Sequence, residues 1–140
     1  MANSAGISGA LKQAALSAVL DGKSLKAAIY LASATTGPTN AVYTVTGEVS
    51  GTGYTAGGAS VTNGNTAGLT TTTAYWTPSA SITWTGLTLT TAFDAVMIYS
   101  TSDTNRSIGV FTIGSQTVTA GNVTLTMPTN DASTGLVRLA

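Results

Sequence analysis

The side chains best suited to acid–base chemistry in this 140-residue sequence are five carboxylates, which lie far apart along the chain: Asp21, Glu48, Asp94, Asp103 and Asp131. A carboxylate-based hydrolase needs two such groups within roughly 5 to 10 Å of each other. None of the five neighbours another in the sequence. We therefore predict no acid–base active site and assign no catalytic residue.

The sequence contains neither histidine nor cysteine. This excludes a Ser-His-Asp triad, a cysteine nucleophile, and zinc, iron or copper sites built from imidazole or thiolate ligands. The glycine-rich stretch 51–57 resembles a dinucleotide-binding loop only superficially, because the residues after it predict strand and turn rather than a helix. We expect no metal, no cofactor and no enzymatic activity.

Charge is scarce and balanced. Five basic and five acidic residues give a net charge of zero, and only 7% of the chain is charged, against about 25% in an ordinary soluble domain. Nucleic-acid binding needs clustered Lys and Arg, whereas the densest basic pair here is Lys23 and Lys26. No apolar run approaches the roughly 18 residues of a membrane span, and the N-terminus has no signal-peptide pattern. We expect no nucleic-acid or membrane partner.

The first 20 residues differ in pattern from the rest. Larger apolar residues recur there at spacings of three and four, which predicts one amphipathic helix over roughly residues 5–20. Asn3 or Ser4 can cap its start, and Asp21-Gly22 supplies its stop. The helix either lies on the sheet that follows it or acts as an arm that docks on a neighbouring subunit.

From Leu25 onward the pattern is that of short strands separated by Gly, Pro and Asn-rich breakers at intervals of about ten residues. This predicts a mainly β fold, an antiparallel β-sandwich or jelly-roll-like domain with one N-terminal helix. We predict a single domain over 1–140, with 1–22 as helix or arm and 23–140 as sandwich. The expected strands are 25–31, 41–46, 59–62, 69–76, 81–89, 93–100, 107–113, 122–127 and 136–139.

Two features favour stabilisation by partners. Leu, Ile, Val and Phe number only 29, which gives a thin core for a small domain. No charged residue occurs from Val49 to Phe93, although free strand edges usually carry charge against unwanted pairing. Either part of this surface is covered in an assembly, or its many Thr hydroxyls hydrate it. Trp76 and Trp84, with Tyr75, either pack in the core with their N–H groups bonded to backbone, or form a sugar-stacking platform.

The order of elements resembles the small structural proteins of tailed bacteriophage particles, which are described as head decoration (cement) proteins or as tail fibre proteins. The matching pieces are the helix stop Asp21-Gly22, the segments 25–31, 47–58 and 93–99, the Trp84 region, the 102–106 turn and the segment 116–125. The phrase Glu-Val-Ser-Gly-Thr-Gly-Tyr at 48–54 is the most specific of them. The chain departs from the family pattern at Asn122 and at Thr55-Ala56.

The resemblance implies a passive virion component. We expect a decoration protein that binds the major capsid protein on the outer surface of the head, and itself as a homotrimer, after residence in the host cytoplasm during assembly. The alternative is a tail or fibre structural or adhesion protein that contacts host glycans. No residue is assigned to partner contact, but residues 1–20 and 49–93 are where we expect it.

Overall fold

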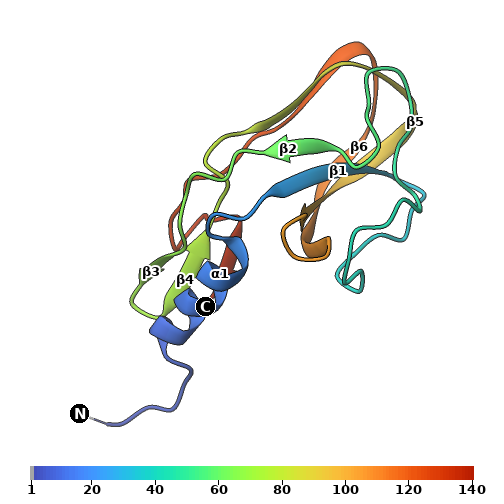
Figure 1. The fold of residues 1–140 in the computed structure, drawn as a ribbon. Coiled ribbons are helices and arrows are strands. Elements are labelled where there is room, and N and C mark those ends of the chain that lie inside the picture. The colour runs from blue at the N-terminus through green and yellow to red at the C-terminus, as the bar shows by residue number, and fades with distance from the viewer. Residues whose placement is uncertain (1) are drawn as a thin grey trace. The chain divides into compact units, whose positions relative to one another are not determined.

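The computed structural model describes residues 2–140 and is mainly β, with antiparallel strands and one helix near the N-terminus, which confirms the predicted fold class and is consistent with a β-sandwich-like fold (Figure 1). The strands form one four-stranded sheet, in the order β2-β1-β5-β6, and one three-stranded sheet, in the order β3-β4-β7. The elements are α1 (Gly9–Leu20), β1 (Leu25–Leu31), β2 (Ala59–Val61), β3 (Gly68–Thr70), β4 (Thr73–Trp76), β5 (Ile82–Ser100), β6 (Arg106–Leu125) and β7 (Val137–Leu139).

The chain divides into two compact units that interleave along the sequence. The helical unit holds α1 and the three-stranded sheet, and comprises the segment up to Gly22, Asn63–Ser79 and Met127–Ala140. The four-stranded unit comprises Lys23–Thr62 and Ala80–Thr126. No single cut in the sequence separates the two units, and the single domain expected over 1–140 stays a prediction.

In the helical unit, α1 packs on β3 and β4. The helix begins four residues later than predicted, because Ser8, and not Asn3 or Ser4, caps it: the Ser8 hydroxyl accepts the Leu11 N–H at 3.2 Å. The stop at Asp21-Gly22 is confirmed, with Asp21 as the C-cap and Gly22 at φ +66°. A hydroxyl close to the first turn is the better cap because its oxygen must reach an N–H within three residues.

The apolar spacing within residues 1–20 includes Leu11, Leu16 and Leu20, and the structure buries only part of this set. Gly9, Leu16 and Leu20 are buried, whereas Leu11 is 61% exposed. Gly9 lies where a Cβ would meet the Leu69 side chain at 2.8 Å, which brings the first turn of the helix close to β3. Since α1 is apolar on almost every side, periodicity alone did not determine which face packs.

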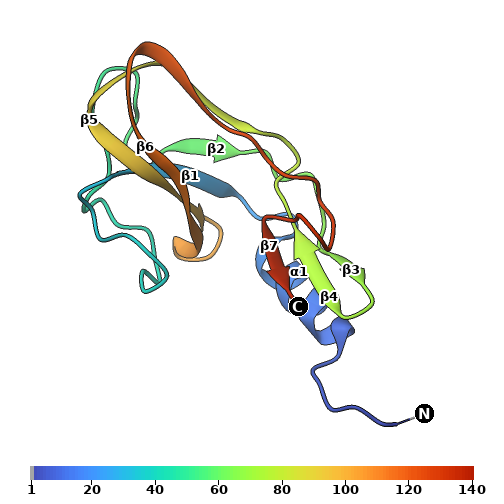
Figure 2. The same ribbon diagram turned by 180° about the vertical axis from the view of Figure 1, so that it is seen from behind.

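In the four-stranded unit, β1 lies between β2 and β5, and β5 and β6 form one long hairpin (Figure 2). β1 and the second half of β5 are buried almost continuously because neighbouring strands and loops cover them. The turn from residue 101 to 105 carries an exposed ion pair between Arg106 and Asp103 at 2.8 Å. This turn is the tip of the β5–β6 hairpin.

Several strand boundaries differ from the prediction. The expected runs 81–89 and 93–100 are one strand, β5, and the runs 107–113 and 122–127 belong largely to β6. Register shifts and positive-φ residues such as Gly86 and Gly114 let both strands bend without ending. The run 69–76 is instead broken at Thr71, where φ is +55°. The run 41–46 forms only an isolated bridge at Val42, because its backbone turns to follow a loop.

Gly58 lies directly before β2, at a point where the backbone passes very close to β1. A substitution there probes this close approach. Its φ is +80°, and a Cβ there would collide with the carbonyl oxygen of Ala27 in β1. We expect Gly58→Ala to lower the free energy of unfolding by about 3 kcal/mol or more, because backbone cannot yield as a flexible side chain can. Gly37→Ala is the matched control, since no atom lies within 4 Å of its Cβ position. Equal urea midpoints for the two variants would contradict this close approach.

Candidate functional site

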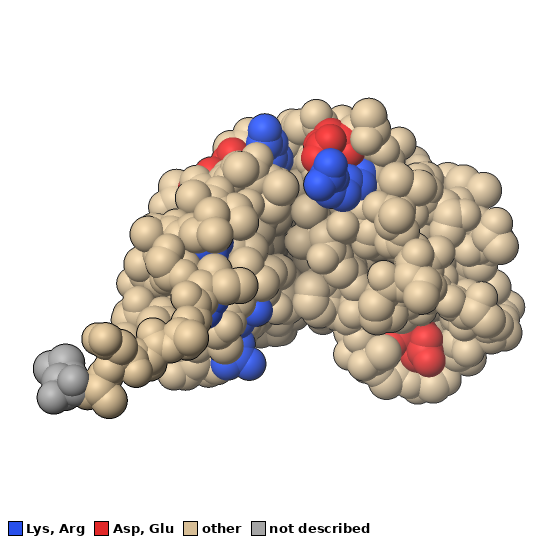
Figure 3. Space-filling view, turned by 90° about the horizontal axis from the view of Figure 1, so that it is seen from below, with Lys and Arg blue, Asp and Glu red and all other residues tan. Residues whose placement is uncertain are grey.

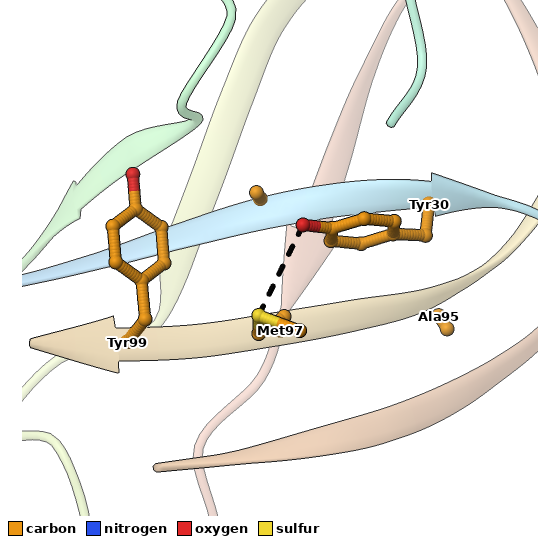
Figure 4. Packing of buried hydrophobic residues seen from close by; sticks show 5 residues of the cluster. Tyr30, Ala95, Met97 and Tyr99 are labelled. Atoms are coloured by element: carbon orange, nitrogen blue, oxygen red, sulfur yellow. Dashed lines mark hydrogen bonds between the residues drawn. The ribbon is translucent and has the colours of Figure 1, made fainter. Parts of the chain in front are cut away.

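Four of the five tyrosines gather around Glu48 in the four-stranded unit. Tyr30 projects from β1 and Tyr99 from β5, and they pack with Ala28, Ala95 and Met97 in one buried cluster (Figure 4). Tyr43, Glu48 and Tyr54 come from the 32–58 segment that connects β1 to β2. We call this group the Glu48–tyrosine cluster. It consists of Tyr30, Tyr43, Glu48, Tyr54 and Tyr99.

The Glu48 carboxylate accepts three hydrogen bonds. Its Oε1 accepts the Tyr54 hydroxyl at 2.6 Å and the Gly57 N–H at 2.8 Å, and its Oε2 accepts the Tyr43 hydroxyl at 2.6 Å. The Tyr54 oxygen in turn accepts the Ile29 N–H of β1 at 3.0 Å. The carboxylate therefore connects residues 43, 54 and 57 of its own loop to one another, and Tyr54 connects this loop to β1.

Tyr30 and Tyr99 hold the same loop by its backbone. The Tyr30 hydroxyl donates to the Thr44 carbonyl at 2.6 Å, and the Tyr99 hydroxyl donates to the Gly57 carbonyl at 2.7 Å. The Tyr43 and Tyr99 rings stack with their centroids 4.6 Å apart. Four aromatic side chains thus fix a connection that contains no regular strand.

The electrostatics keep these hydroxyls protonated. Burial raises the pKa of Tyr30 to about 12, and the negative charge of Glu48 adds to this effect. Burial, followed by the hydrogen bond to Glu48, also raises the pKa of Tyr43 and of Tyr54. Burial and then Glu48 raise the pKa of Tyr99. The neutral hydroxyls act as hydrogen-bond donors, two of them to the Glu48 carboxylate and two to backbone carbonyls, which is a structural role rather than that of a base.

Glycines allow the other end of the same loop to reach β5. Thr52 forms a bridge with Thr88, whose N–H donates to the Thr52 carbonyl at 2.9 Å. Gly53 has a φ of +80°, and a Cβ there would collide with the Gly86 carbonyl. The 48–54 segment therefore holds the loop against the sheet. Its glutamate accepts hydrogen bonds from tyrosines, and its glycines allow the loop backbone to approach the β5 backbone closely. The 48–54 motif was recognisable in the sequence. It did not predict which tyrosines from other parts of the chain would pack around it.

The remaining acids have local structural roles or none that the contacts define. Asp21 Oδ1 accepts the Ala67 N–H at 2.8 Å, and Asp131 caps a turn through the Ser133 and Thr134 N–H groups at 2.8 and 2.7 Å. Asp94 lies half-buried within β5. Among residues 2–140, no group of three or more acidic side chains is placed to hold a metal ion.

The tryptophans do not form an exposed platform. Trp76 is 0% and Trp84 6% exposed, so both indole rings pack inside the protein. Their burial matches the core interpretation, but neither Nε1 has a hydrogen-bond partner within residues 2–140, so the expected bonds to backbone are absent there. The large apolar area of each ring offsets the cost of one unpaired N–H.

One face of α1 is apolar and exposed. It consists of Ala10, Leu11, Ala14, Ala15 and Ala18, which we call the outer face of α1, and Ile7 before it is 65% exposed. The polar side chains Lys12 and Gln13 lie on the other side of the helix. Lys12 donates to the Thr72 carbonyl at 3.1 Å, and Gln13 donates to the Ala67 carbonyl at 3.0 Å. A surface helix ordinarily presents charged residues to water on this side. The region 1–20 thus offers an uncovered apolar surface.

The second uncovered feature is the edge of the four-stranded sheet. β6 is the last strand in the sheet order and 20 residues long. Ala41 and Tyr43 bond to its start, where the Ser107 N–H donates to the Ala41 carbonyl at 3.0 Å. Beyond that point, residues 108–125 pair only with β5. Charged side chains are few on the face of the molecule drawn in Figure 3.

Comparisons with known proteins identify no relative. No protein-family model, no curated protein and no solved structure matches the chain. Within the described part of the chain, no helix is both long enough and apolar enough to span a bilayer.

Removing the Glu48 carboxylate should loosen the loop. We expect Glu48→Ala to lower the free energy of unfolding by about 3 kcal/mol, because two tyrosine hydroxyls and the Gly57 N–H lose their acceptor. Glu48→Gln keeps an oxygen and the side-chain shape, so its loss should be about 1 kcal/mol. Urea unfolding of the two variants against the parent measures both values, and equal losses would contradict this expectation by showing that a neutral amide oxygen replaces none of the carboxylate's contribution.

The tyrosine pKa values predict sensitivity to alkali. A pKa raised from 10 to about 12 means that the folded state holds the Tyr30 proton more tightly than the unfolded state does. Its contribution is complete below pH 10 and is lost as the pH rises from 10 to about 12. The free energy of unfolding, measured in urea at several pH values, should fall across this window, and less steeply in Tyr30→Phe. An identical slope in that variant would exclude Tyr30 as a cause.

Proposed function

We propose that the chain is a capsid decoration (cement) protein of a tailed bacteriophage, bound to the outer surface of the assembled head. The observation that carries this proposal is the outer face of α1, which leaves Leu11 61% exposed on a surface without charge. A protein with so little charge and a thin core gains from burying such a face against a partner. The resemblance in element order and in the 48–54 phrase supports the choice of partner.

The mechanism is thermodynamic. A protein that binds only the assembled shell stabilises it by mass action, in proportion to its concentration relative to its dissociation constant. By contacting neighbouring major-capsid subunits, each copy also opposes their separation. The loop fixed by Glu48 supports this role, since a rigid subunit loses less conformational entropy on binding than a mobile one does.

The tail or fibre assignment is the alternative place for the same protein in the particle. Its adhesion version relied on exposed tryptophans, and both indoles are buried. We therefore favour the head, where a passive bridging surface suffices.

A substitution on the outer face of α1 tests the proposal. Leu11→Lys should change the free energy of unfolding by no more than about 0.5 kcal/mol, because the side chain faces solvent. It should nonetheless abolish cosedimentation with shells that lack the protein, since a charge would be buried unpaired. Thr129→Lys, exposed in the 129–134 turn of the same helical unit, is the matched control and should bind as the parent does.

Quantitative mass spectrometry of purified particles locates the parent protein. A copy number equal to that of the major capsid protein, or a simple fraction of it, supports the head. A few to a few dozen copies would overturn the decoration role in favour of the tail, and absence from the particle would reject both.

A further inference from the structure

Tyr43 and Tyr99 are the stacked pair of rings in the Glu48–tyrosine cluster. Their ring centroids lie 4.6 Å apart, and their planes differ by 20°. Tyr43 belongs to the 32–58 connection, whereas Tyr99 projects from β5 (Figure 4). Rings at this separation are in van der Waals contact. A covalent bond between a carbon of one ring and a carbon of the other would therefore need only a small movement.

The two hydroxyls lie at the same end of this stack. The Tyr43 hydroxyl donates to Glu48 Oε2 at 2.6 Å. The Tyr99 hydroxyl donates to the Gly57 carbonyl at 2.7 Å. These two acceptors are themselves joined, because the Gly57 N–H donates to Glu48 Oε1 at 2.8 Å. The ring carbons next to each hydroxyl, which are the carbons that couple when tyrosyl radicals combine, are therefore brought to one end of the pair.

Glu48 gives Tyr43 a proton acceptor. A phenol is oxidised by one electron most readily when its hydroxyl proton can leave at the same time, and a carboxylate at hydrogen-bond distance can take that proton. Burial, and then the hydrogen bond to Glu48, raise the pKa of Tyr43. The Tyr43 proton therefore stays on the hydroxyl until the electron is removed.

The two tyrosines differ in their access to solvent. Tyr43 is half-buried, so a small oxidant in solution can reach its exposed part. Tyr99 is only 3% exposed, so a radical on another molecule cannot approach its ring. A bond to Tyr99 must therefore come from a neighbour within the same chain, and the ring stacked on it is that of Tyr43.

We propose that Tyr43 and Tyr99 form an oxidative cross-linking site, which a diffusible one-electron oxidant converts into a dityrosine within one chain. The oxidant class is represented by tris(bipyridyl)ruthenium(III), which light and persulfate generate in solution. The product would join the 32–58 connection to β5 covalently. Since a cross-link between residues far apart in sequence restricts the unfolded chain, this oxidation should stabilise the fold.

The reaction balances as follows for one cross-link. Each of the two rings loses one electron and its hydroxyl proton, and the two electrons reduce two ruthenium(III) complexes to ruthenium(II). Both protons end in water, that of Tyr43 by way of Glu48. The two radicals then form one carbon–carbon bond, and the hydrogen on each bonded carbon moves to the oxygen of its own ring. The chain has then lost two hydrogen atoms in all.

Photo-oxidation of the full chain in dilute solution tests the proposal. The product should keep the mobility of a single chain on a denaturing gel, show dityrosine fluorescence, and weigh two hydrogen atoms less than the parent. Glu48 is the only glutamate in the sequence. After denaturation, a protease that cuts at glutamate should therefore split the untreated chain in two, whereas the two pieces of the oxidised chain should stay joined.

Two phenylalanine variants provide the matched comparison. Tyr43→Phe keeps the ring but cannot form the radical, so its two pieces should separate after oxidation and cleavage. Tyr75 lies in the helical unit, and Tyr75→Phe should stay joined as the parent does. Joined pieces from Tyr43→Phe, separated pieces from Tyr75→Phe, or dityrosine found only in linked pairs of chains would overturn the proposal.

Fragmentation of the joined parent pieces in a mass spectrometer gives a readout that does not depend on the variants folding. It should place the bond between Tyr43 and Tyr99. A bond through Tyr30, Tyr54 or Tyr75, or a parent whose pieces separate, would also overturn the proposal. These outcomes do not depend on the capsid assignment, because they concern the isolated chain.

Discussion

A carboxylate that is drawn partly out of water must find donors within the protein, and this requirement at Glu48 organises the four-stranded unit. Its two oxygens accept Tyr43, Tyr54 and the Gly57 N–H. Tyr54 carries the connection on to β1 through the Ile29 N–H. A connection of this length without regular structure would otherwise be mobile. Here a network of charge-assisted and neutral hydrogen bonds gives it a single arrangement.

The position of this loop against the sheet also explains why the sequence around Glu48 is rich in glycine. The glycines at 51, 53, 57 and 58 let the backbone pass close to β1 and β5. A side chain at 51, 53 or 58 would collide with a carbonyl, and Gly57 has a φ of +91°. The Tyr99 hydroxyl donates to the buried carbonyl of Gly57. These contacts join the loop to the sheet, which suits the bridging role that we propose.

Two surfaces are left uncovered by the rest of their own unit, and the two differ in the kind of partner that could cover them. The outer face of α1 offers apolar area, which any complementary surface can bury. The edge of β6 offers backbone groups, which only a strand can match. Both lack charge, so association through either would depend little on salt compared with a surface built on ion pairs.

Local pattern was sufficient for much of the fold. The apolar spacing before Asp21 predicted the helix, and alternation predicted the strand 25–31, because these signals depend only on residues adjacent in sequence. Local pattern misplaced the ends of β5 and β6, since bulges let a strand continue through glycines that ordinarily break it. It predicted the buried positions Leu16 and Leu20 of α1 but also placed Leu11 among them, because a helix that is apolar on most sides has no single preferred face until a sheet is present.

The sequence by itself determined the fold class, the scarcity of charge and the absence of histidine and cysteine chemistry, because composition and short-range period are properties of the chain alone. Only the tertiary structure decided that Glu48 accepts hydrogen bonds from Tyr43 and Tyr54, that both tryptophans are buried, and that β6 is an edge. Each of these depends on contacts between residues far apart in sequence, and the order of strands within a sheet is not encoded in the pattern of any one strand.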